Sequence, residues 1–146
     1  MNVLADGDPA LVPRTPVPCI LPYHLTRSAY PFQLSDEEWK KRLSAEEFRV
    51  LRQGGTEAPG KGQYCTFFPK TGFFACRACA HPLYSANCKF KDCGWDAYDK
   101  CFYPDDRCHV GLRGHQGHAE ACCNNCGSHL GHVFFREGHT PTNARH

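Results

Sequence analysis

The sequence has no long apolar run, no excess of one charge and no secretory leader pattern. No stretch approaches the roughly 18 apolar residues that a membrane-spanning helix requires, so we expect no contact with a membrane. The net charge is only +2, from 17 Lys and Arg against 15 Asp and Glu, without the basic stripe of a nucleic-acid-binding domain. The N-terminus lacks the charged and then apolar segments of a secretion signal. We therefore expect a cytoplasmic or organellar protein that is not secreted and binds no nucleic acid.

Length and composition indicate one mainly β domain behind a flexible extension. The 146 residues support a single moderate core, and 13 Gly and 11 Pro favour a turn-rich fold of short strands. Residues 1–32 hold six of the prolines and have no hydrophobic period, which predicts a flexible N-terminal extension. The domain itself is expected over residues 33–146.

Two short helices are predicted at the start of this domain. Ser35 with Glu38, and Ser44 with Glu47, form the capping-box pattern of a hydroxyl three residues before a carboxylate. Short apolar runs bounded by Gly, Pro or Asn then predict strands over residues 64–68, 73–77, 82–85, 98–103, 120–123 and 129–135. We expect these strands to form two antiparallel sheets.

Eleven cysteines are present, an odd number that argues against a simple disulfide framework. Four of them form two CxxC pairs, Cys76 with Cys79 and Cys123 with Cys126, separated by 43 residues. Two such turns together can make a tetrahedral thiolate site for a structural Zn²⁺. The alternative, a thioredoxin-like redox motif, needs alternating strands and helices, which the pattern does not predict.

Three further motifs each have a functional and a structural interpretation. Cys93-Gly94-Trp95 can place a flat apolar side chain beside a thiol, or be a core Trp next to an incidental Cys. His129 and His132 follow the second CxxC pair closely, and can donate protons or orient a ligand by hydrogen bonds, or instead lie on the surface or act as extra metal ligands. Residues 140–146 can carry function or be a frayed polar tail. Spacing alone leaves these alternatives open.

The order of motifs resembles the methionine sulfoxide reductase B family. The segments that carry the resemblance are CRAC, CGW, CNNC, GSHLGHVF and TPTNARH, together with the Gly55-Thr56-Glu57 loop, and it extends from about Asp36 to His146. The resemblance implies a thiol-dependent reduction of methionine-(R)-sulfoxide in peptides and proteins to methionine. It also implies a monomer that acts on oxidised proteins and is regenerated by thioredoxin or a similar dithiol.

The resemblance also implies roles for individual residues. Trp95, with Phe134 near it, would form the apolar wall for the methyl group of the sulfoxide. His129 and His132 would bind or protonate its oxygen, and Arg145 would favour the thiolate form of the nucleophile. Attack on sulfur leaves a cysteine sulfenic acid, which a resolving thiol converts to a disulfide. Cys93 matches the resolving position of the family.

The chain departs from the family pattern at its end. The attacking cysteine or selenocysteine of the family directly follows the position of His146, which is the last residue of this sequence. A UGA codon interpreted as a stop, a lost C-terminal segment and a true pseudoenzyme are three explanations. We expect the 146-residue chain to lack the C-terminal strand of its relatives and to be inactive. Cys65 and Cys122 are the other candidates for an attacking thiol.

Two further points remain open at this stage. Asp96 stands where the family has Pro, which places a charge near the Trp95 wall. The resolving residue is undecided because the chain has three additional cysteines, Cys88, Cys101 and Cys108. The main alternative function is a non-catalytic zinc module that binds oxidised-methionine peptides or a protein partner. A nucleic-acid-binding zinc ribbon is a further alternative, against which the lack of a basic patch argues.

Overall fold

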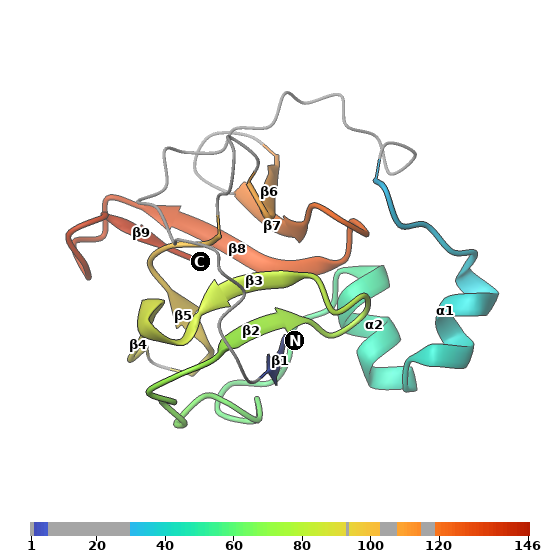
Figure 1. Cartoon of the computed structure of the whole chain (residues 1–146), viewed down its shortest axis with the longest axis horizontal. Coiled ribbons are helices and arrows are strands. Elements are labelled where there is room, and N and C mark those ends of the chain that lie inside the picture. The colour runs from blue at the N-terminus through green and yellow to red at the C-terminus, as the bar shows by residue number, and fades with distance from the viewer. Residues whose placement is uncertain (1, 6–29, 93, 103–107, 115–118) are drawn as a thin grey trace.

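Within the residues that the structure describes, the domain has three antiparallel sheets and two α-helices (Figure 1). The computed structural model describes residues 2–5, 30–92, 94–102, 108–114 and 119–146. The first sheet has the order β1–β2–β3, formed by Asn2–Ala5, Phe73–Cys76 and Pro82–Ser85. The second has the order β6–β7–β8–β9, formed by Val110–Arg113, Ala119–Cys123, His129–Phe135 and Ala144–Arg145. The mainly β prediction is confirmed.

A third, two-stranded sheet adds to the two that were expected. It pairs β4 (Lys89–Phe90) with β5 (Ala97–Tyr98) and follows a short 3-10 turn, η2 (Ala86–Cys88). Each of these strands is only two residues long, and such short segments give no alternating pattern in the sequence. The small sheet matters because it flanks the segment that contains Trp95.

Both predicted helices are present, and both capping boxes form. Helix α1 covers Asp36–Arg42 and α2 covers Ala45–Gln53. The Ser35 and Ser44 side chains each accept a backbone N–H of the first turn. Gly54, in the left-handed region with φ of 71°, ends α2. The fully buried Trp39 ties α1 to the core.

The two larger sheets form layers, with both helices at one end and β4 and β5 toward the other (Figure 1). One core cluster joins side chains of both sheets and of the helices, including Phe74, Leu83, Val110, Val133 and Trp39. A core that draws on every layer fixes the sheets relative to one another. Among the described residues, no helix is long and apolar enough to cross a membrane.

Three segments differ from their predicted structure. Of the strand expected over residues 98–103, only Tyr98 belongs to a strand, β5, in the described part of the chain. Residues 64–68 were expected as a strand, but they form a turn in which the Phe67 N–H donates to the Tyr64 carbonyl at 3.2 Å. Tyr64 packs edge-on against Phe74, so the aromatic residues of this run fill a surface layer without strand pairing. Asn2–Ala5, within the expected extension, pairs with β2 as the edge strand β1. The boundary at residue 33 stays a prediction.

Candidate active site and metal centre

Four cysteine side chains meet where the turn between β2 and β3 faces the turn between β7 and β8. The Sγ atoms of Cys76, Cys79, Cys123 and Cys126 all lie within 4.8 Å of one another. The Cys76–Cys126 and Cys79–Cys123 sulfur pairs are 3.8 and 3.7 Å apart. Thiolates bound at about 2.3 Å to a tetrahedral ion are separated by about 3.8 Å. The cluster therefore has the dimensions to hold a metal ion.

The two CxxC turns share one backbone arrangement. The Ala80 N–H donates to the Cys76 carbonyl at 2.8 Å, and the Gly127 N–H donates to the Cys123 carbonyl at 2.7 Å. Ala80 and Gly127 both have positive φ, 59° and 71°. A Cβ added at Gly127 would lie 2.4 Å from the ring of Tyr30, so glycine is required there. Each chain reversal leaves its two thiols on the same side of the turn.

Helix α2 contacts both turns. Arg52 Nη1 donates to the Cys126 carbonyl at 3.0 Å and to the Ser128 hydroxyl at 3.1 Å. On the first turn, Arg77 forms an ion pair with Glu47 of the helix. The cluster, α2 and the start of β8 are therefore one connected unit, and β8 carries the predicted histidines.

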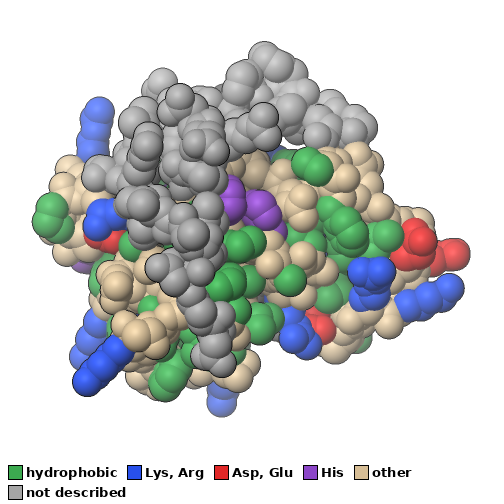
Figure 2. All heavy atoms as spheres, in the orientation of Figure 1, with side chains coloured by type: hydrophobic (Ala, Val, Ile, Leu, Met, Phe, Trp, Pro, Cys, Tyr) green, Lys and Arg blue, Asp and Glu red, His purple; other side chains and the backbone are tan. Residues whose placement is uncertain are grey.

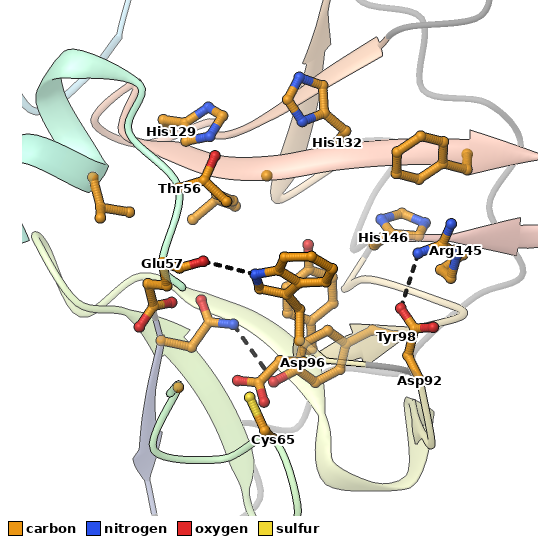
Figure 3. Close-up of a pocket in the computed structure, with 18 of the residues that line it drawn as sticks. Thr56, Glu57, Cys65, Asp92, Asp96, Tyr98, His129, His132, Arg145 and His146 are labelled. Atoms are coloured by element: carbon orange, nitrogen blue, oxygen red, sulfur yellow. Dashed lines mark hydrogen bonds and ion pairs between the residues drawn. The ribbon is translucent and has the colours of Figure 1, made fainter. Parts of the chain in front are cut away.

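A cavity of about 390 Å³ lies along β8 and the end of β9. Its lining includes five residues that the sequence analysis predicted for the site: Trp95, His129, His132, Phe134 and Arg145. Histidine side chains lie near the centre of one face of the molecule, beside apolar ones (Figure 2). Figure 3 shows His129 and His132 on β8 along one side of the cavity, with Asp96 and Cys65 opposite. Residues far apart in the sequence thus meet in one place.

Trp95 is a wall of this cavity rather than a core residue. Its indole N–H donates to the Glu57 carbonyl at 2.9 Å, and 38% of the residue is exposed. The neighbouring Gly94 accepts a hydrogen bond from the Gly60 N–H at 2.7 Å, and an added Cβ there would be 3.3 Å from Pro59. The glycine allows the two loops to approach, and this approach orients the indole.

His129 and His132 line the same cavity although they are three residues apart on a strand. Regular alternation would place them on opposite faces of the sheet. The alternation is interrupted because Gly131 has a φ of 147° and the register of β7 against β8 shifts between Ala121 and Cys122. The two imidazole rings consequently lie edge to face, with centroids 5.7 Å apart.

Glu120 of β7 holds the ring of His129. Glu120 Oε1 lies 2.8 Å from His129 Nδ1 and 2.8 Å from Arg113 Nη2. The hydrogen bond from His129 and the charge of Arg113 lower the pKa of Glu120, against the effect of burial. Because an ionised carboxylate only accepts hydrogen bonds, Nδ1 of His129 carries a proton and Nε2 is left for the cavity.

Arg145 is held by two carboxylates at the end of the cavity. Its Nη1 donates to Asp92 at 2.9 Å, and its Nε and Nη2 donate to Glu137 at 2.6 and 2.9 Å. The guanidinium also lies 4.5 Å over the ring of Phe134. The hydrogen bonds to Glu137, followed by the charge of Asp92, raise the pKa of Arg145. Its cation is therefore a fixed part of the cavity wall.

His146 has a different environment from the other two histidines. The backbone N–H of His146 donates to the Tyr98 carbonyl at 2.8 Å, and the backbone N–H of Tyr98 donates to the His146 carbonyl at 3.3 Å. The ring lies edge-on to Tyr84, with centroids 5.8 Å apart. Both ring nitrogens are buried without a hydrogen-bond partner in the described part of the chain, and burial lowers the pKa of His146 to about 4. The ring is neutral and acts by packing.

Asp96 does not place an unpaired charge beside the indole. Its Oδ1 lies 3.3 Å from the Lys89 ammonium, whose side chain is only 1% exposed. The ammonium also lies 4.6 Å from the centre of the Phe68 ring. The charge that the sequence placed near the Trp95 wall is thus neutralised by a buried lysine.

The cysteines outside the cluster differ in their access to the cavity. Cys93, the predicted resolving thiol, lies outside the described residues. Cys65 lines the cavity, and its thiol donates to the Gly94 carbonyl at 3.3 Å. Cys122 is fully buried, with its sulfur 3.4 Å from the Tyr30 hydroxyl. Cys122 is not part of the four-thiol cluster, although it directly precedes Cys123.

The sequence analysis missed the carboxylates that hold the predicted side chains. Glu120 carried a signal, because a charged residue beside Ala and Cys in a short, largely buried strand needs a partner. Asp92 and Glu137 carried none, since their link to Arg145 spans 53 and 8 residues and appears only in the folded chain.

Comparison with known proteins agrees with this arrangement. A family model described as the SelR domain matches residues 43–146. An uncharacterised protein of Schizosaccharomyces pombe is 44% identical over 124 residues, which cover 80% of this chain and 86% of that protein. Peptide methionine sulfoxide reductase B3 of Arabidopsis thaliana is 44% identical over 124 residues, covering 78% of this chain and 64% of the relative. Peptide methionine sulfoxide reductase B5 of Oryza sativa subsp. japonica is 43% identical, covering 78% and 83%.

Proposed function

We propose that this chain reduces methionine-(R)-sulfoxide in peptides and proteins to methionine. The chain belongs to the SelR-domain family of peptide methionine sulfoxide reductases B. The observation that carries this proposal is that His129, His132 and Trp95 line one cavity. A sulfoxide has a polar oxygen that accepts hydrogen bonds and a methyl group that needs an apolar surface. Imidazole N–H groups suit the first, and an indole face suits the second.

Both histidines act on the sulfoxide oxygen. Glu120 orients the His129 ring, because its carboxylate accepts the hydrogen bond from Nδ1 at 2.8 Å. His129 Nε2 and the exposed His132 then bind the oxygen and supply the proton that it needs as the S–O bond breaks. Trp95 holds the methyl group, and the ring of Phe134 continues the apolar wall.

The attacking group is the cysteine or selenocysteine that follows the position of His146 in the family motif. Side chains alternate along a strand, so a residue added after His146 would lie on the same face as Arg145, which lines the cavity, if β9 continued to it. The Arg145 cation favours the thiolate form. The reduced enzyme and the sulfoxide give methionine and an enzyme sulfenic acid, and the oxygen passes from substrate to enzyme.

Regeneration requires a second thiol. Cys93 attacks the sulfenic sulfur, a disulfide forms and water leaves; thioredoxin or a similar dithiol then reduces that disulfide by exchange. A Cys93→Ser variant of an active, extended protein is expected to produce one methionine per chain and to lose thioredoxin-dependent turnover. Undiminished turnover would assign the role to another thiol, with Cys65 in the cavity as the first candidate.

The four-thiol cluster would hold a structural zinc ion. Its thiol donors and its sulfur spacing of 3.7 to 3.8 Å suit tetrahedral Zn²⁺. Four thiolates would complete a tetrahedral coordination sphere and leave no position for a reacting water. The metal would stabilise the two turns that place β8, and would take no part in the reaction.

Two proteins test the proposed activity: the 146-residue chain, and the same chain with one cysteine added after His146. Each is loaded with zinc and offered a blocked peptide containing the separated R or S sulfoxide, with dithiothreitol as reductant. The methionine peptide is measured by chromatography. We expect the extended protein to reduce the R form at least about 100-fold faster than the S form, and the 146-residue chain to show no turnover.

Each alternative gives a different result. Binding of the R peptide without turnover in the extended protein would support a non-catalytic zinc module. Equal rates with both sulfoxides would contradict a shaped cavity, and turnover by the 146-residue chain would assign the attack to a thiol within it.

A further inference from the structure

Two buried thiols lie next to each other outside the metal cluster. The sulfurs of Cys101 and Cys108 are 3.3 Å apart, and the residues are 2% and 7% exposed. Cys101 comes three residues after the end of β5, and Cys108 two residues before β6 begins. Neither belongs to the four-thiol cluster.

The backbone around this pair is fixed by four hydrogen bonds. The Phe102 N–H donates to the Leu83 carbonyl at 2.9 Å, and the His109 N–H donates to the Phe102 carbonyl at 3.0 Å. Asn124 donates from its side chain to the Cys108 carbonyl at 2.6 Å and from its N–H to the His109 carbonyl at 3.0 Å. The two thiols are therefore held together by the fold on both sides.

Their spacing suits a disulfide rather than a metal. Paired sulfurs in the cluster are 3.7 to 3.8 Å apart, the edge of a metal-centred tetrahedron. The Cys101–Cys108 distance is shorter, and no third His, Cys, Asp or Glu joins them in the part of the chain that the structure describes. Closing 3.3 Å to a disulfide bond of about 2.05 Å needs only a small rotation of each side chain.

We propose that Cys101 and Cys108 form a second redox site, a dithiol that a hydroperoxide converts to an intramolecular disulfide. The more exposed Cys108 attacks the peroxide oxygen; the O–O bond breaks, and a sulfenic acid and water or an alcohol form. Cys101 then attacks the sulfenic sulfur, the S–S bond forms and a second water leaves. Two thiols are oxidised and one peroxide is reduced. The site needs neither the metal nor the proposed reductase activity.

The position of the pair separates it from the cavity by one layer of side chains. Tyr84 lines the cavity on one side and lies near both thiols on the other. Burial is the main cause that raises the pKa of Tyr84, and the nearby Cys101 and Cys108 add to it. On its other contacts the Tyr84 ring stacks on Tyr98, with centroids 4.1 Å apart, and meets His146 edge-on at 5.8 Å. The disulfide therefore forms behind the cavity wall.

Peptide mapping of the zinc-loaded chain tests the proposal directly. Trypsin cleaves after Lys100, Arg107 and Arg113, so Cys101 and Cys108 fall on separate peptides, CFYPDDR and CHVGLR. The chain is treated with one equivalent of hydrogen peroxide, free thiols are alkylated, and the digest is analysed by mass spectrometry, with released zinc followed by a chromogenic chelator. We expect these two peptides to be linked, two hydrogens lighter than their sum, with zinc retained and the link removed by dithiothreitol.

The expected yield of this link is about tenfold above that of any other cysteine pair, because the thiols are already in contact. A Cys88→Ser control, which removes another buried cysteine, should leave the yield unchanged, and Cys108→Ser should abolish it. Recovery of both peptides alkylated while other cysteines oxidise, or a dominant link from either peptide to a different cysteine, would overturn the proposal. The wild-type result is decisive even where a variant does not fold. None of these outcomes depends on sulfoxide reduction.

Discussion

The four-thiol cluster and the cavity are adjacent but are assembled in different ways. The cluster takes all its ligands from two local turns, each with the same CxxC spacing and the same chain reversal. The cavity collects residues that are far apart in the sequence, among them residues 55–57, 95–96, 129–132 and 145–146. Changes in the cluster should therefore act first on the stability of the fold, and changes in the cavity should act on chemistry while the fold persists.

Removal of the metal gives the largest expected effect on stability. Metal binding to four thiolates is part of the folding free energy, and a loss of about 5 kcal/mol would lower the Tm by roughly 15 °C for a domain of this size. Calorimetry before and after a strong chelator measures it, with elemental analysis showing one ion per chain. The Cys88→Ser variant, outside the cluster, should respond to the chelator as the wild type does. An unchanged Tm after full removal would contradict the role of the cluster.

His132→Ala changes the cavity and should lower activity with little effect on stability. His132 is exposed on β8, so its removal should shift the Tm by less than about 2 °C. In the cysteine-extended protein, loss of a proton donor should lower kcat/KM by about 100-fold. The matched control is His139→Ala, an exposed histidine outside the cavity lining. Equal losses of activity in both variants would remove His132 from the proposed mechanism.

His146→Phe tests whether a cavity residue can act through packing. The pKa of His146 is lowered from 6.5 to about 4 by burial, so the folded chain holds the ring neutral where the unfolded chain binds a proton. Wild-type stability is therefore complete above about pH 6.5 and falls as the pH approaches 4. Near pH 4.5 the wild type should lose about 2 kcal/mol relative to the variant. Urea unfolding at pH 7 and 4.5 measures the difference, and parallel pH curves would refute the buried neutral ring.

Glu120→Gln has a smaller expected effect on stability than His146→Phe. The folded carboxyl has a lowered pKa, so its stabilising contribution is present above the ordinary value and disappears as the pH falls through the folded one. At pH 7 the variant should be about 1 kcal/mol less stable, since the pair is partly exposed. This difference in stability between the variant and the wild type should disappear as the pH falls below the pKa of the folded Glu120 carboxyl. Glu37→Gln, an exposed glutamate of α1, is the control; a gap independent of pH would mean that the ionised pair contributes nothing.

The sequence predicted most of what is local. Capping boxes at Ser35 and Ser44 gave both helices, and the CxxC spacing gave the four-thiol cluster. Strands β2, β3, β7 and β8 followed from short apolar runs. These features are set by neighbours within a few residues, which a pattern can record.

What the sequence did not predict depends on contacts between distant segments. Residues 64–68 have strand composition but no partner strand, and the backbone forms a turn. The common direction of His129 and His132 required the irregularity at Gly131, which spacing alone does not give. The sequence also did not predict that Lys89 is the buried partner of Asp96, because the two side chains meet only when β4 pairs with β5.

A single-turnover experiment tests the central claim, that the cavity along β8 reduces a sulfoxide when an attacking thiol follows His146. The zinc-loaded, cysteine-extended protein is mixed with excess R-sulfoxide peptide in the absence of any external reductant. One methionine peptide per chain, together with oxidation of the added cysteine, is the predicted result. Bound peptide with no methionine formed and the added cysteine still reduced would contradict the account.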